Sequence, residues 1–170
     1  MNRRNGMVVA LLLAAAALAW GIRYFSDEAR IRRAWKALAR AVAEEKLLAV
    51  GGHVSRRYGD PYGQSYESLL GMTADLFSTY EDLRLSHSVG PVSVSGTTAA
   101  LDIEFRLYGS AMGKSGIILG ERATPCKASI LMRREHGDWL VERVESVEIP
   151  NAPPPGAPAK DGDKGKEPDR

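Results

Sequence analysis

The sequence predicts an α+β domain in which helices pack against an antiparallel β-sheet. Apolar residues recur every three or four positions in the first half of the chain and every second position in the second half. The clearest strand covers residues 97–108, where Leu101, Ile103 and Phe105 alternate with charged side chains. One apolar face and one charged face are typical of an antiparallel sheet with one solvated side.

Composition and charge limit the function classes. The 170 residues leave room for one domain with extensions. The net charge of +2, from 23 basic and 21 acidic side chains, is too small to predict a nucleic-acid-binding protein. Cys126 is the only cysteine, so no disulfide can form within the chain and the fold depends on its core.

Residues 1–25 are predicted to be a transmembrane signal anchor. The stretch 7–22 is uncharged and follows Arg3 and Arg4. As a helix it would span about 24 Å, somewhat less than the hydrocarbon core of a bilayer, and flanking arginine and aromatic residues would extend it. We expect a single-pass protein of the cell membrane with an extracytoplasmic domain. The alternative is a signal peptide cleaved after the A-L-A at 17–19, which would leave a secreted or periplasmic protein.

A first helix is predicted from Ser26, as its N-cap, to Gly51-Gly52. Its apolar stripe consists of Ile31, Trp35, Leu38 and Val42. Four basic residues lie off this stripe: Arg30, Arg33, Lys36 and Arg40. They form either a solvated helix face or a contact with anionic lipid headgroups beside the membrane segment.

A turn and a second helix follow. The D-P-Y-G sequence at 60–63 has the composition of a type I turn, and Ser65 is a suitable N-cap. Apolar residues at intervals of three and four predict a helix over 66–80. Gly71 lies inside this helix, and we interpret it as a mark of close packing.

Four antiparallel strands are predicted after this helix. They cover 83–94, with an interruption at Gly90-Pro91, then 97–108, 126–133 and 139–149. The segment 109–125 is interpreted as a glycine-rich connection. The domain therefore covers residues 26–150. The tail, 151–170, is rich in proline, glycine and balanced charges and is expected to be disordered.

This order of elements resembles the nuclear transport factor 2-like superfamily. The residues that carry the resemblance are Tyr58 and Asp60 as Tyr-x-Asp, Gly63 before the second helix, the alternating strands, and the G-D-W-L-V at 137–141. The resemblance implies a strongly bent antiparallel sheet curled around the helices as a cone with an apolar pocket. Such pockets host isomerases, dehydratases, epoxide hydrolases and polyketide cyclases, and other members are non-catalytic binding or assembly modules. The fold alone therefore leaves the function open.

Three residues are weak candidates for a catalytic role. His87 is in phase with the inward residues Leu83 and Leu85 and has the side chain of a general base, but a hydrogen-bonded histidine at the sheet margin is the favoured explanation. Asp60 is either a pocket acid or the first residue of the turn. Tyr58 either lines the mouth of the pocket or has only a packing role. Asp102, Glu104 and Arg106 lie opposite the apolar face, so we expect them to point outward.

Several other chemistries are not supported. His53, His87 and His136 lack the spacing of metal ligands, and we predict neither a metal site nor a cofactor. The G-K-S at 113–115 lacks the earlier glycine and the following helix of a phosphate-binding loop. Cys126 has no histidine nearby in sequence and is interpreted as a small buried apolar residue.

We therefore expect a membrane-anchored, non-catalytic module that binds a small apolar ligand or a protein partner, with homodimer formation through the outer sheet face. One alternative is an isomerase- or dehydratase-type enzyme that uses His87, Asp60 and Tyr58 on a small apolar substrate. Another is an assembly subunit of a membrane complex. The expected partners include the lipid bilayer, through residues 7–22, and exclude nucleic acid.

Overall fold

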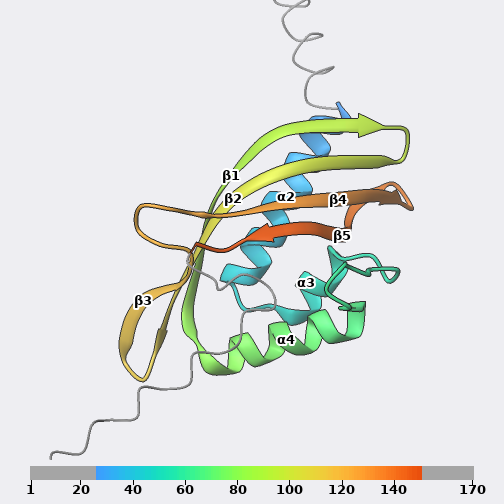
Figure 1. The fold of residues 1–170 in the computed structure, drawn as a ribbon. Helices are drawn as coiled ribbons and strands as arrows, with labels where there is room; N and C mark the ends of the chain where they lie inside the picture. The colour runs from blue at the N-terminus through green and yellow to red at the C-terminus, as the bar shows by residue number, and fades with distance from the viewer. Residues whose placement is uncertain (1–25, 151–170) are drawn as a thin grey trace, which may run out of the picture.

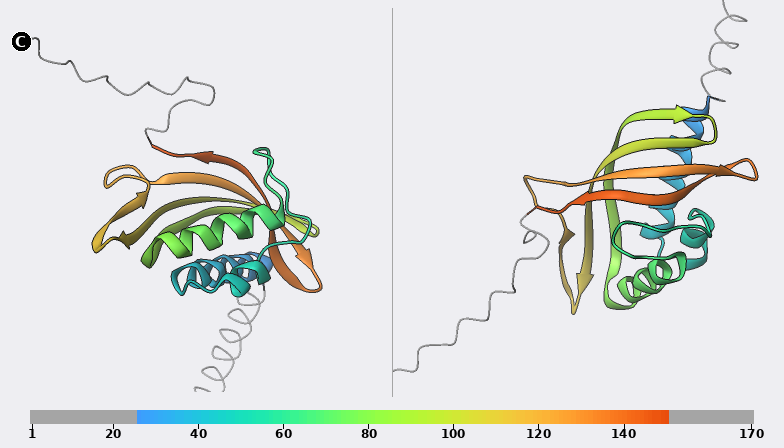
Figure 2. Two further views of the ribbon diagram at one scale, coloured as in Figure 1. Left: turned by 90° about the horizontal axis from the view of Figure 1, so that it is seen from below. Right: turned by 45° about the vertical axis from the view of Figure 1, so that its right-hand side comes forward.

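A computed structural model describes residues 26–150. These residues form a curved antiparallel β-sheet with three helices on one side of it (Figure 1). Figure 2 shows α2, α3 and α4 gathered together beneath the sheet. No helix within 26–150 has the length and hydropathy that crossing a membrane requires. The expected anchor at 1–25 and the expected disordered tail at 151–170 lie outside the described residues.

Helix α2 (Asp27–Ala43) supplies the centre of the core. Its N-cap is Ser26, whose hydroxyl accepts a hydrogen bond from the Ala29 N–H at 3.3 Å. The predicted apolar stripe faces the sheet, with Ile31 fully buried and Trp35 6% exposed. Both belong to one hydrophobic cluster with residues of β2, β4 and β5. The amphipathic pattern therefore identified the packed face of this helix.

The predicted single helix from 27 to 52 is wrong, because the chain breaks into α2 and α3 (Leu47–Gly52). Glu45 adopts a left-handed conformation, with φ of 54°. The N–H of Lys46 then bonds Ala41 O, and the N–H of Glu45 bonds Val42 O. These two bonds form a Schellman motif, which ends α2. Glycine is the usual residue at this left-handed position and marks the end of a helix in a sequence. Because Glu45 occupies the position here, the sequence did not show where α2 ends.

The loop from 53 to 65 runs beside β5. Val54 forms a parallel bridge with Val141, and the predicted turn is present, with the Gly63 N–H bonded to Asp60 O at 3.2 Å. Ser65 caps α4 (Tyr66–Thr79) in a reciprocal capping box with Ser68. The interpretation of Gly71 as a close-packing position is wrong. It is exposed, and an added Cβ would meet no atom within 4 Å.

The sheet has five strands rather than the predicted four. They are β1 (Glu81–Ser95), β2 (Thr98–Ala111), β3 (Lys114–Leu119), β4 (Cys126–Glu135) and β5 (Asp138–Glu148), in the order β1-β2-β4-β5, and β3 also pairs with β2. The segment interpreted as a connection therefore contains β3. The predicted interruption at Gly90-Pro91 is a register shift within a continuous edge strand, where proline is tolerated.

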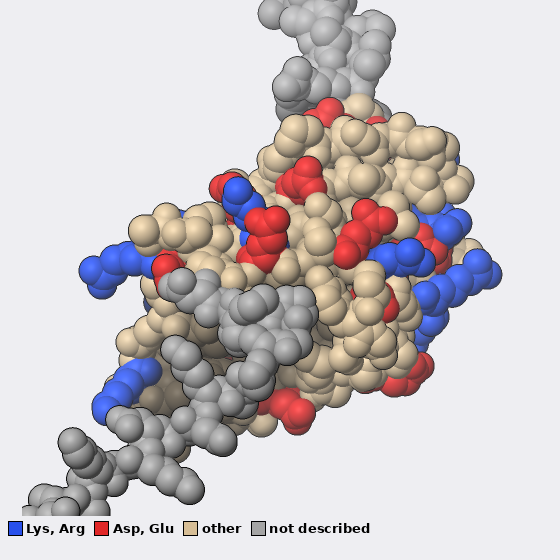
Figure 3. Space-filling model, in the orientation of Figure 1, with Lys and Arg blue, Asp and Glu red and all other residues tan. Residues whose placement is uncertain are grey.

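The two faces of β2 are as predicted. Leu101, Ile103 and Leu107 are buried, whereas Asp102 and Glu104 are exposed. Phe105 is only half-buried. On the uncovered part of the face shown in Figure 3, acidic and basic side chains are interspersed.

Candidate functional site

His87 lies on the inner side of β1, at the edge of the sheet. Its ring meets the Trp35 ring edge to face, with centroids 6.1 Å apart and planes at 83°. Its Nδ1 lies 3.4 Å from the Leu85 carbonyl oxygen, and Phe105 is its cross-strand neighbour. The predicted inward orientation is confirmed. Among the described residues, however, the surroundings of His87 are aromatic, and the structure gives it no acidic partner.

Tyr58 and Asp60 form a hydrogen-bonded pair within the loop. The buried Tyr58 hydroxyl donates to Asp60 Oδ2 at 2.9 Å, and Asp60 Oδ1 accepts the N–H groups of Tyr62 and Gln64, each at 2.9 Å. Burial raises the pKa of Tyr58, and the hydrogen bond to the Asp60 carboxylate raises it further. The hydroxyl therefore stays protonated at neutral pH, and Asp60 organises the turn.

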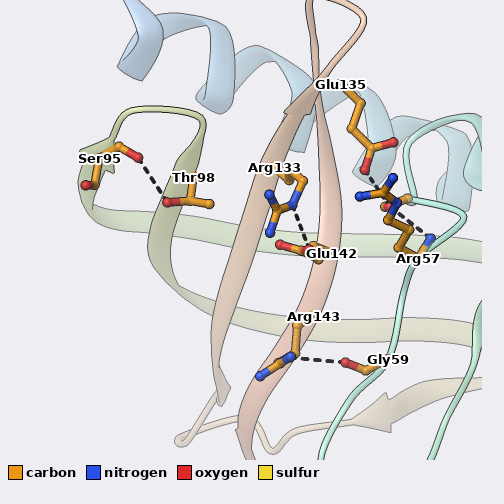
Figure 4. Close-up of polar contacts among 9 residues, drawn as sticks. Arg57, Gly59, Ser95, Thr98, Arg133, Glu135, Glu142 and Arg143 are labelled. Carbon is orange, nitrogen blue, oxygen red and sulfur yellow. Dashed lines mark hydrogen bonds and ion pairs between the residues drawn. The ribbon is translucent and has the colours of Figure 1, made fainter.

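This pair and His87 lie at opposite edges of the sheet. The loop is fastened to β5, because the Gly59 N–H bonds Glu142 O and Arg143 Nε donates to Gly59 O at 3.2 Å (Figure 4). His87 is on β1, three strand spacings away, or about 14 Å along the sheet. Among the described residues no hydrogen bond or ion pair joins His87 to Tyr58 or Asp60, so the three candidates do not form one hydrogen-bonded acid–base cluster.

Sequence reasoning missed a buried polar contact at Ser55. This side chain is completely buried; its hydroxyl donates to Glu135 Oε1 at 2.7 Å and accepts the Arg57 N–H (Figure 4). The contact joins the loop to the end of β4. Because a substrate cannot reach Ser55, we interpret the contact as structural. Its sequence signal was weak, since Glu135 is 80 residues away.

The structure also places the residues that were considered for metal binding, thiol chemistry and phosphate binding. No group of three histidine, cysteine or acidic side chains in the described part of the chain is placed to hold a metal ion. Cys126 is completely buried, and burial raises the pKa of its thiol. The G-K-S sequence lies at the β2–β3 hairpin, where Met112 and Gly113 have positive φ values. It is therefore a turn and not a phosphate-binding loop.

Most of the arginines on α2 are occupied within the domain. Arg32 donates to the Val89 and Gly90 carbonyl oxygens of β1, Arg30 donates to Gly137 O, and Arg40 pairs with Glu44. The contacts of Arg32 and Arg30 attach α2 to β1 and to the β4–β5 turn. They favour a structural role for these two arginines over contact with lipid headgroups.

Three surface hollows provide other candidate sites. The outer-face hollow, of about 470 Å³, is lined by Asp102, Glu104, Lys127, Glu148 and several serines. The arginine hollow, of about 710 Å³, is lined by Asp82, Arg84, Tyr108, Gly109, Ser115, Gly116, Ile117 and Arg122. A third hollow, of about 410 Å³, lies between α2 and the β4–β5 turn. None of the three is lined by Tyr58, Asp60 or His87.

Comparison with known proteins identifies the fold only. No protein-family profile and no curated protein matches the sequence. Among solved structures, a proposed scytalone dehydratase from Novosphingobium aromaticivorans is similar, with a TM-score of 0.62 and 10% identity over 72% of this chain and 83% of that chain. A proposed dehydratase of the nuclear transport factor 2-like family from Streptomyces avermitilis has a TM-score of 0.60 and 14% identity over 74% and 97%.

A third structure, a ketosteroid isomerase-like protein from Erwinia carotovora atroseptica, has a TM-score of 0.57 and 16% identity over 75% of this chain and all of that one. At such identities a structural match carries the fold but not the activity. The helices against a curved antiparallel sheet, in the same arrangement as these neighbours, show that this chain has the nuclear transport factor 2-like fold.

Proposed function

We propose that this protein is a non-catalytic binding module with a nuclear transport factor 2-like fold, held at the cell membrane by residues 7–22. The observation that supports the proposal is the separation of the candidate catalytic groups. His87 packs on Trp35 at one edge of the sheet, and the hydroxyl of Tyr58 is already bonded to Asp60 at the other. General acid–base catalysis needs such groups within reach of one substrate.

The outer face of the sheet is the surface that we propose for a protein partner, with a second copy of the chain as the first choice. Its hollow contains the acids Asp102, Glu104 and Glu148 together with Lys127. In a two-fold symmetric pair each copy presents the same patch, so the lysine of one copy can meet the acids of the other. The neighbouring serines are small and permit close approach.

Mass measurement of the full chain by light scattering tests the dimer. We expect a dimer at micromolar concentration and a monomer for the variant Lys127→Glu, which leaves only acidic groups on the patch. Lys114→Glu, at the distant β2–β3 hairpin, is the matched control and should leave the mass unchanged. A monomeric wild-type chain would exclude self-association and leave a different membrane protein as the partner, to be sought by co-purification after mild detergent extraction.

The inner side of the sheet beside α4 is the proposed site for a small apolar ligand. Apolar side chains of α4, including Leu69, Leu76 and Phe77, are only half-buried there. Native mass spectrometry of the purified chain would detect a bound ligand, and NMR of the released ligand after incubation would detect any conversion. Recovery of the ligand unchanged is expected for a binding module.

The competing function is an isomerase- or dehydratase-type enzyme. Two observations support it: the described activities of the similar structures, and a Tyr58 hydroxyl that is kept protonated and could donate a proton. If the wild-type chain converts the ligand and both Tyr58→Phe and His87→Gln lose this conversion, the protein is an enzyme and the binding proposal is overturned. Each variant should keep the fold, because each preserves most of the side-chain volume.

A further inference from the structure

The arginine hollow contains a row of three side chains from three neighbouring strands. Arg84 of β1 lies opposite Tyr108 of β2, and Tyr108 lies opposite Ile117 of β3. Cross-strand neighbours of this kind lie about 5 Å apart and act together on one face of a sheet. A guanidinium, an aromatic ring and an aliphatic side chain therefore share one surface in this hollow.

Two guanidinium groups of the hollow have no partner within the described part of the chain. Most other arginines of the described chain form ion pairs, hydrogen bonds or ring contacts, but the structure gives the side chains of Arg84 and Arg122 none among residues 26–150. Unpaired guanidinium groups that line the same hollow attract an anion, because each offers a planar fork of N–H donors that fits a carboxylate.

The loop that carries Arg122 is held in place by the domain. Arg106 Nε donates to Glu121 O at 2.8 Å, and its Nη2 donates to Arg122 O at 3.5 Å. The Glu121 N–H also bonds Thr124 O at 2.8 Å. A fixed backbone lowers the ordering cost that a ligand must overcome, so this position of Arg122 favours binding.

One acid in the hollow limits the charge of the ligand. Asp82 lines the hollow, and its carboxylate lies 3.4 Å from the Ser110 hydroxyl. Two guanidinium groups and one carboxylate leave a single net positive charge, which matches a monoanion better than a dianion. The hydroxyls of Tyr108 and Ser115 add hydrogen-bonding groups, and Ile117 with the Tyr108 ring adds apolar surface. The volume of about 710 Å³ is within the range of small-molecule sites.

We propose that the arginine hollow is a binding site for a small aromatic monocarboxylate, whose carboxylate pairs with Arg84 and Arg122 and whose ring lies against Tyr108 and Ile117. The site is distinct from the inner side of the sheet and from the outer-face hollow. The inference therefore goes beyond the proposed function and stands whether or not the interior is catalytic.

Titration of the full chain with benzoate, followed by calorimetry and by backbone amide NMR shifts, tests the site. We expect saturable binding at millimolar concentration, with shifts centred on residues 82–84, 108–110 and 115–122. Arg84→Gln and Arg122→Gln should each weaken binding about tenfold, as expected for the loss of a charge-assisted hydrogen-bonded pair. Arg84→Lys keeps the positive charge but loses the planar pair of N–H donors, so it should weaken benzoate binding less than Arg84→Gln does.

Arg57→Gln is the matched control, because Arg57 is also exposed and unpaired among the described residues but lies in the loop beside β5. It should bind benzoate as the wild type does. Benzamide, a neutral analogue, should not bind, and inorganic phosphate should bind more weakly than benzoate. Absence of saturable benzoate binding, equal binding of benzamide or phosphate, or an equal loss in Arg57→Gln and Arg84→Gln would overturn the proposal. None of these outcomes bears on whether the outer face forms a dimer.

Discussion

Helices α2 and α4 lie on the same side of the sheet but are packed differently. Helix α2 fully buries Ile31 and nearly buries Trp35 against β2, β4 and β5. In α4 only Tyr66, in the first turn, is buried, and the later apolar residues remain half-buried. In strand β3, in the three-stranded part of the sheet, no residue is buried. The core is filled under α2, whereas α4 and β3 keep apolar surface partly accessible, although Leu83 and Leu107 beside β3 are buried.

This difference separates stability from function within a single fold. The half under α2 is close to full packing, so we expect it to carry most of the free energy of unfolding. The half beside α4 and β3 is less packed and also borders the arginine hollow. Less stable elements of this kind are the ones available for binding.

The largest expected effect comes from placing a charge under α2. Leu101 is 2% exposed, so Leu101→Asp buries an unpaired carboxylate and should abolish cooperative folding. Ile118→Asp is the matched change in the half-buried strand β3 and should leave a folded domain with a lower melting temperature. Circular dichroism melts distinguish the two, and an equal loss in both would show that the halves do not differ.

Truncation of one aromatic side chain on each helix compares the packing of α2 and α4 without introducing a charge. Trp35→Ala should lower the free energy of unfolding by about 3–5 kcal/mol, because it leaves a cavity in the filled half. Phe77→Ala, in the half-buried part of α4, should lower it by about half as much. Denaturant unfolding measures both values, and a larger loss for Phe77→Ala would contradict the assignment of the core to α2.

Removal of the helix caps tests local stability. Ser65→Ala breaks the capping box of α4 and should cost about 1 kcal/mol. Because α4 has few buried side chains, we expect faster amide hydrogen exchange throughout α4. Ser26→Ala removes the cap of α2, where packing holds the helix, and should lower global stability without faster exchange in the centre of α2. Similar exchange in both helices would contradict this difference.

The smallest effect concerns Glu44, at the break between α2 and α3. Hydrogen bonds from Lys46 and Arg40 lower the pKa of Glu44 from 4.5 to about 2. A group with a lowered folded-state pKa stabilises the fold above its ordinary pKa and loses that contribution as pH falls through its folded pKa. We therefore expect a small loss of stability between about pH 4.5 and pH 2 that is absent in Glu44→Gln. NMR titration of the Glu44 carboxylate measures the midpoint directly.

Much of the fold could be predicted from local patterns. The alternation in β2 identified its buried and exposed faces, and the two capping serines marked where α2 and α4 begin. Strand β3 was missed because its burial is partial and Gly116 interrupts its pattern, so little distinguishes it from a loop. The break after α2 was missed because Glu45 occupies a position where glycine is the usual signal.

The candidate site was harder to predict, because it depends on distances between elements. The sequence identified the inward orientation of His87 and the turn at Asp60. The hydrogen bond between Tyr58 and Asp60, and their separation from His87 across the sheet, required the strand order. The arginine hollow had no local signal at all, since Arg84, Tyr108 and Arg122 come from different segments.

By itself, then, the amino-acid order determined which side chains avoid water and where most of the helices and strands begin, because periodicity and capping act over only a few residues. The tertiary structure decided which strands pair, which helix is buried and which polar groups meet. These outcomes depend on the packing of segments that are far apart in the chain, and no short pattern encodes that packing.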